Sequence, residues 1–201
     1  MEDVIARRFL ADMEAFANER SERCAERIRA EYAAGCTEAG ESLLTCLKDL
    51  AGRYRQLEGQ AVTGAVREIY LSFMRTSILL DLPPYRIDFY DERGRRSLVE
   101  CADRWDFALV YRHFRELKAE LAQRFERQTR VRGYVLDGML YDLGDRFHQV
   151  ASELIPGVIA GLGRRIREIE GLGGDVRVYL GEFLDRAEVV WVDLGGAIIG
   201  V

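Results

Sequence analysis

Apolar residues recur along most of the chain at steps of three and four residues, the spacing of one face of an α-helix. This spacing predicts a first helix over about residues 2–32 and a second over about residues 43–61. It also predicts a helix that begins near Phe107 and another that begins after Gly133, is kinked or restarted at Pro156 and ends at Gly171. Such helices bury their apolar stripes against one another, so the sequence predicts a mainly α protein, a single-domain multi-helix bundle over residues 1–201.

The segment from Ala61 to Leu82 is apolar almost all round, which is typical of the buried central helix of a bundle. Pro83 and Pro84 are expected to end this helix. One polar line is expected along it, formed by Glu68, Ser72, Arg75 and Thr76.

Arg75 stands out in this line because a guanidinium in a core must be paired and hydrogen-bonded. It is expected to face water or to join a structural ion pair. Alternatively, Arg75 lines a ligand pocket with Glu68, where it would bind a carboxylate or phosphate through a forked contact.

Two segments depart from the helical period. Residues 85–90 alternate apolar and polar side chains, which predicts a small hairpin flap at about residues 85–100. Residues 176–193 fit a second hairpin slightly better than a helix. Tyr85 and Trp105 lie in or next to the first hairpin and are candidate ligand-binding residues, although anchoring of the hairpin to the helices is the favoured interpretation.

The best polar constellation lies on the helix after Gly133. At 100° per residue, one flank of this helix is shared by Asp137, Tyr141, Asp145, His148 and Ser152. Asp145 and His148 are three residues apart and would reach the same metal ion. A second Asp/Glu-x-x-His pattern is missing, so a solvated helix face is the favoured interpretation. His113 is expected to be a partly buried, hydrogen-bonded histidine, with ligand binding as the alternative.

The four cysteines, Cys24, Cys36, Cys46 and Cys101, form no CxxC pair. Free core thiols are therefore favoured over a metal site or disulfides. The N-terminus lacks the features of a signal peptide, and the apolar tail over residues 189–201 is too short to span a bilayer. These features predict a cytoplasmic protein without a membrane partner.

The net charge and the missing motifs disfavour some classes of function but identify none. The formal net charge is -5, and the arginine clusters lack interleaved aromatic residues, which disfavours a nucleic-acid partner. No nucleotide-binding, metalloprotease or hydrolase motif occurs, and no family signature is present. No catalytic residue and no cofactor is therefore predicted.

The leading hypothesis is an intracellular helical protein-interaction or regulatory module without catalysis. It would bind a protein partner or form a homo-oligomer, because the first helix has a thin apolar stripe that needs cover. The alternative is a ligand- or metal-binding protein, or an enzyme acting on a small molecule. Its polar pocket would lie around Arg75, His113, Asp145 and His148. Nucleic-acid binding is the third class.

Overall fold

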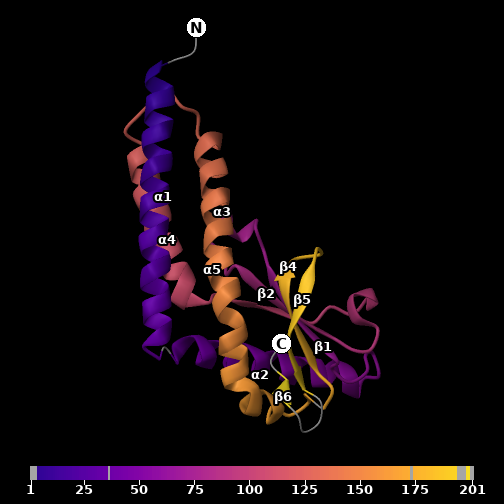
Figure 1. Cartoon of the computed structure of the whole chain (residues 1–201). Helices are drawn as coiled ribbons and strands as arrows, with labels where there is room; N and C mark the ends of the chain where they lie inside the picture. Colours follow the sequence, from indigo (N-terminus) through magenta and orange to yellow (C-terminus); the bar gives the residue numbers. More distant parts are fainter. Residues whose placement is uncertain (1–3, 36, 173, 194–197, 200–201) are drawn as a thin grey trace. The chain divides into compact units, whose positions relative to one another are not determined.

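The computed structural model describes residues 4–35, 37–172, 174–193 and 198–199. It is 59% helical, with a mixed sheet of five strands to which a sixth, two-residue strand is added (Figure 1). The chain divides into two compact units. The described residues of unit 1 fall within Met1–Cys36, Arg75–Leu82 and Ala108–Ala151, and those of unit 2 fall within Thr37–Met74, Pro83–Phe107 and Ser152–Val201. A single domain over the whole chain remains a prediction.

Unit 1 is helical. Its elements are α1 (Val4–Ala33), α3 (Ser77–Leu80), α4 (Ala108–Phe125) and the N-terminal part of α5 (Tyr134–Arg167). Helix α1 packs along α4, where the rings of Phe9 and Phe125 meet edge to face with centroids 5.9 Å apart. The guanidinium carbon of Arg124 lies 3.6 Å from the centre of the Phe16 ring. These contacts cover the thin apolar stripe of α1 in part, since Met13 and Ile28 are buried and Phe9 and Phe16 are half-buried.

The short helix α3 is fixed between α4 and α5. Lys118 on α4 donates hydrogen bonds to the carbonyl oxygens of Ile78 at 2.8 Å and Leu79 at 3.3 Å, and it pairs with Asp81 at 2.7 Å. A cation at the C-terminal carbonyls of a helix satisfies acceptors that have no partner inside the helix. On the other side, Ile78 packs against Gly144 of α5.

Replacing Gly144 with alanine is expected to lower the free energy of unfolding by about 1–2 kcal/mol, because overpacking forces neighbours to move. The added Cβ would lie 2.8 Å from Cγ1 of Ile78. Gly138→Ala is the matched control on the same helix, since nothing lies within 4 Å of its added Cβ. This control is expected to gain about 1 kcal/mol from helix propensity. Urea unfolding measures both, and equal stabilisation by the two substitutions would contradict the packing.

Unit 2 contains the sheet, in the order β3-β2-β1-β4-β5-β6. The parallel pair is β1 with β4, and the remaining neighbours are antiparallel. The bounds are β1 (Glu68–Phe73), β2 (Tyr85–Tyr90), β3 (Ala102–Trp105), β4 (Arg177–Glu182), β5 (Ala187–Asp193) and β6 (Ile198–Ile199). Unit 2 also holds α2 (Glu38–Gly59), the 3-10 turn η1 (Gly94–Arg96) and the C-terminal part of α5.

One face of this sheet forms the core of unit 2 together with the buried side of α2. The rings of Tyr54 on α2 and Phe89 on β2 have centroids 6.0 Å apart. Leu162 of α5 lies beside Gly40 of α2, which brings the two helices together. The buried residues of the sheet on this side are Ile69, Leu71, Phe73, Tyr85, Ile87, Phe89, Val178 and Leu180.

The predicted buried helix from Ala61 to Leu82 is wrong. The segment forms strand β1 in unit 2 and the short helix α3 in unit 1. Strand β1 lies between β2 and β4, and Ile69, Leu71, Ser72 and Phe73 are all buried. Ile69, Leu71 and Phe73 alternate with Glu68, Tyr70 and Ser72, a two-residue period that predicts a strand and that the dense apolar residues on either side of it obscure.

The mainly α bundle with small hairpins is therefore wrong as a fold class, since helices and an extended mixed sheet coexist. Residues 85–90 form a strand as predicted, but its partners are β1 and residues 102–105, so the small hairpin confined to residues 85–100 is wrong. The two strands predicted within 176–193 are confirmed as the antiparallel pair β4 and β5, which belongs to the same sheet. The four long helices are also confirmed, and α5 continues through Pro156.

Candidate functional site

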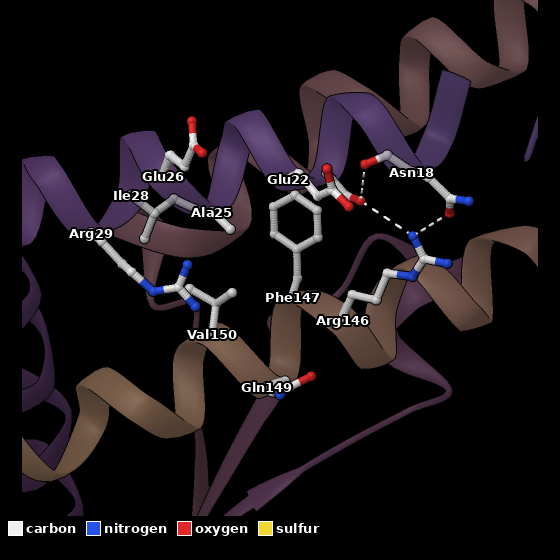
Figure 2. Close-up of a pocket in the computed structure, with 11 residues that line it drawn as sticks. Asn18, Glu22, Ala25, Glu26, Ile28, Arg29, Arg146, Phe147, Gln149 and Val150 are labelled. Carbon is white, nitrogen blue, oxygen red and sulfur yellow. Dashed lines mark hydrogen bonds between the residues drawn. The ribbon is translucent and has the colours of Figure 1, made fainter. Parts of the chain in front are cut away.

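A groove of about 610 Å³ lies between α1 and α5 within unit 1 (Figure 2). Residues at steps of three and four share one flank of α1, and a single turn of α5 forms the opposite wall. The lining residues are Asn18, Ser21, Glu22, Ala25, Glu26, Ile28 and Arg29 from α1, and Arg146, Phe147, Gln149 and Val150 from α5.

The base of the groove is apolar and its edges are charged. Ile28, Phe147 and Val150 are buried, whereas Glu22, Glu26, Arg29 and Arg146 are exposed. Figure 2 shows Arg29 and Arg146 reaching into the groove from its two ends, with Phe147 and Val150 between them. Two carboxylates and two guanidinium groups cancel in formal charge, so the groove as a whole has no strong preference for an anion or a cation.

Arg146 crosses the groove from α5 to α1. Its Nη1 donates hydrogen bonds to Oδ1 of Asn18 and, at 3.3 Å, to Oγ of Ser21. The Ser21 hydroxyl in turn donates to the carbonyl oxygen of Asn18 at 2.9 Å. Beyond this crossing, a smaller cavity of about 40 Å³ continues along α1 as far as Glu14. The groove therefore follows α1 for about four turns.

The opposite flank of α1 is fastened to α4 by charged groups. Arg20 pairs with Glu120 at 2.6 Å, and Glu31 accepts hydrogen bonds from Arg112 and His113. Burial by itself would raise the pKa of the Glu31 carboxyl, but the hydrogen bonds from His113 and Arg112 outweigh it and lower the pKa to about 2. Because α4 covers this flank, a binding partner can reach α1 only on its remaining surface, which includes the flank that lines the groove.

The structure places His113 in the core, where it is 3% exposed and lies 3.2 Å from the Glu31 carboxylate. This agrees with the favoured interpretation of a buried, hydrogen-bonded histidine. This contact joins α1 to α4 and does not line a ligand pocket.

Arg75 and Asp145 come together although they are far apart in sequence. Nη2 of Arg75 lies 2.8 Å from Oδ2 of Asp145, and its guanidinium carbon lies 5.2 Å from the centre of the Tyr141 ring. Both charged side chains are about half exposed. This geometry matches the structural ion pair considered for Arg75, and it occupies the Asp145 oxygen that a metal ion would use. His148 follows one turn later on the same helix, and burial lowers its pKa to about 4.

The other candidate ligand residues lie in unit 2. Tyr85 and Trp105 are buried, and their ring centroids are 5.8 Å apart, as expected for residues that anchor strands to a core. Nε1 of Trp105 donates to the Ser42 hydroxyl at 2.9 Å. Glu68 opens strand β1 and accepts hydrogen bonds from the hydroxyls of Tyr70 at 3.2 Å and Tyr179 at 3.4 Å.

Within the described ranges, no three His, Cys, Asp or Glu side chains are grouped so that they could hold a metal ion. Cys101 is buried with a free thiol, Cys24 and Cys46 are free and half-buried, and Cys36 lies outside the described residues. No helix in this part of the chain has both the length and the apolar character needed to cross a membrane. Most of the predicted tail beyond Asp193 also lies outside the described residues.

Sequence reasoning did not identify the groove. The one signal in the sequence is the stretch from Asn18 to Arg23, where α1 has almost no apolar side chains. A polar stretch in the middle of a packed helix indicates that one flank there is not covered. No family model matches the chain, and neither a curated protein nor a solved structure is detectably similar to it.

Proposed function

We propose that this chain is a cytoplasmic, non-catalytic interaction module that associates with a second copy of itself through the α1–α5 groove. The occupant of the groove is helix α1 of the second copy. The observation that supports this proposal is the balanced set of charges along one open flank of α1, with acid at Glu22 and base at Arg29 on either side of the small residue Ala25.

A helix is the occupant that suits the groove best. The groove is bounded by two helices, it follows α1 for several turns, and its base is apolar. Two helices can pack closely where a small residue lies at their crossing point and charged residues flank it, and the groove flank of α1 has this pattern at Glu22, Ala25 and Arg29. The small side chain of Ala25 lies in the middle of the groove, where it allows a second helix backbone to approach closely.

The charges favour a second copy over other partners. A nucleic acid or an anionic membrane requires a concentrated positive surface, whereas the groove has equal numbers of acidic and basic residues. A surface that carries both signs can be complementary to itself, and most soluble oligomers use such self-complementary interfaces. The groove of each copy would then receive α1 of the other.

Replacing Ala25 with tryptophan is expected to weaken self-association about tenfold, because the indole ring keeps the two helices apart. Sedimentation equilibrium from low to high micromolar concentration measures the dissociation constant. Ala30→Trp is the matched control, since Ala30 is exposed on α1 and does not line the groove. A wild-type chain that stays monomeric throughout, or an equal effect of both substitutions, would contradict the proposal.

A further inference from the structure

The flank of α1 that lines the groove is acidic toward its N-terminal end and basic toward its C-terminal end. Glu22 lies on the N-terminal side of Ala25 and Arg29 on the C-terminal side, and all three line the groove. Glu22 and Arg29 are seven residues apart, two helical turns, so they lie on nearly the same line of the helix surface. Ala25 lies close to the midpoint between them.

This polarity distinguishes the two ways in which a second α1 can lie in the groove. In a parallel pair in register, every residue meets its own copy, so Glu22 would face Glu22 and Arg29 would face Arg29. In an antiparallel pair centred on Ala25, Glu22 of each copy faces Arg29 of the other. Like charges across a helix interface repel, and opposite charges at the same separation attract.

From this order of charges we infer that α1 pairs with α1 of a second copy in an antiparallel arrangement, with the two-fold axis near Ala25 and reciprocal Glu22–Arg29 ion pairs. The inference rests on the proposed function and adds the orientation and register of the partner helix. A two-fold axis repeats each contact, so one pair of residues supplies two ion pairs.

The remaining groove charges are compatible with this arrangement. Glu26 lies near the expected axis, but Figure 2 shows its side chain directed away from α5, so the two copies of Glu26 need not meet. Arg146 is held by Asn18 and Ser21 of its own chain. Ala25 leaves room at the axis, where the two helix backbones come closest.

Charge reversal tests the orientation. Glu22→Arg or Arg29→Glu alone places like charges at both symmetry-related contacts of an antiparallel pair, and each is expected to weaken self-association about tenfold. The double variant Glu22→Arg/Arg29→Glu restores both ion pairs and is expected to return to the wild-type dissociation constant. An equimolar mixture of the two single variants is expected to form a heterodimer with wild-type affinity.

In a parallel pair, each single reversal exchanges one like-charged contact for another and leaves the affinity unchanged. Asp12→Arg is the matched control, because Asp12 is exposed on α1 and does not line the groove. Single reversals without effect, in a chain whose association Ala25→Trp still weakens, would overturn the antiparallel inference alone. A wild-type chain that does not self-associate would overturn the proposed function and the inference with it.

Discussion

Replacing Gly181 with alanine is expected to lower the free energy of unfolding of unit 2 by about 3 kcal/mol or more, the largest effect of any single methyl group considered. Gly181 lies in strand β4 opposite Ala187 of β5. A Cβ at this position would lie 2.1 Å from the carbonyl oxygen of Arg186 and 2.6 Å from Cα of Ala187. Both obstacles are backbone atoms, so no side-chain rotation relieves the clash, and the start of β5 must move.

Chemical denaturation of the purified chain measures this loss, and amide exchange in β4 and β5 localises it. Gly52→Ala on α2 is the matched control in the same unit, because nothing lies within 4 Å of its added Cβ. Alanine at a helical position with open space around its Cβ is expected to add about 1 kcal/mol of stability. Gly181→Ala that unfolds at the same denaturant concentration as the wild type would show that the two strands are not this close.

The second large effect is a loss of stability in mild acid caused by His148. Burial lowers the pKa of this histidine to about 4 in the folded chain, whereas an unfolded histidine titrates near 6.5. Between these values the unfolded chain binds a proton that the folded chain does not. Stability due to His148 is therefore complete above pH 6.5 and falls as the pH decreases toward 4, by about 2–3 kcal/mol in total.

Unfolding free energies of the wild type and of His148→Gln, measured from pH 7.5 to pH 4.5, test this expectation. The wild type is expected to lose about 2–3 kcal/mol more than the variant over this range. The titration of the imidazole itself, followed by nuclear magnetic resonance, is expected to have its midpoint near 4. Parallel pH profiles for the two proteins, or an imidazole midpoint near the ordinary value, would contradict the burial of His148.

The long helices were predictable because each has an apolar stripe that repeats every three to four residues over at least four turns. The stripe that contains Val110, Phe114, Leu117 and Leu121 is buried, as its spacing indicates. The sheet was less predictable. Strand β1 is a short alternating run of six residues among other apolar residues, and its partner β4 lies more than a hundred residues away, so no local pattern reveals the pairing.

The functional residues show the same division between local and distant information. The spacing of Asp145 and His148 on one helix could be read from the sequence, but the position of Arg75 beside Asp145 could not. The groove depends on the distance between α1 and α5, which no local pattern records. The polar stretch that begins at Asn18 was visible, yet only the structure shows that it forms one wall of a cavity.

The contact between Lys118 and α3 has a consequence for how unit 1 holds its shape. Four residues are far too few for a helix to persist by itself in water. The helical state of α3 therefore depends on contacts with its neighbours, among them one ammonium group of α4, which is mostly buried and binds two carbonyl oxygens and one carboxylate. Any modification that neutralises the Lys118 amine, such as acetylation, would remove the cation at the C-terminus of α3. It would thereby weaken the packing of Ile78 against Gly144.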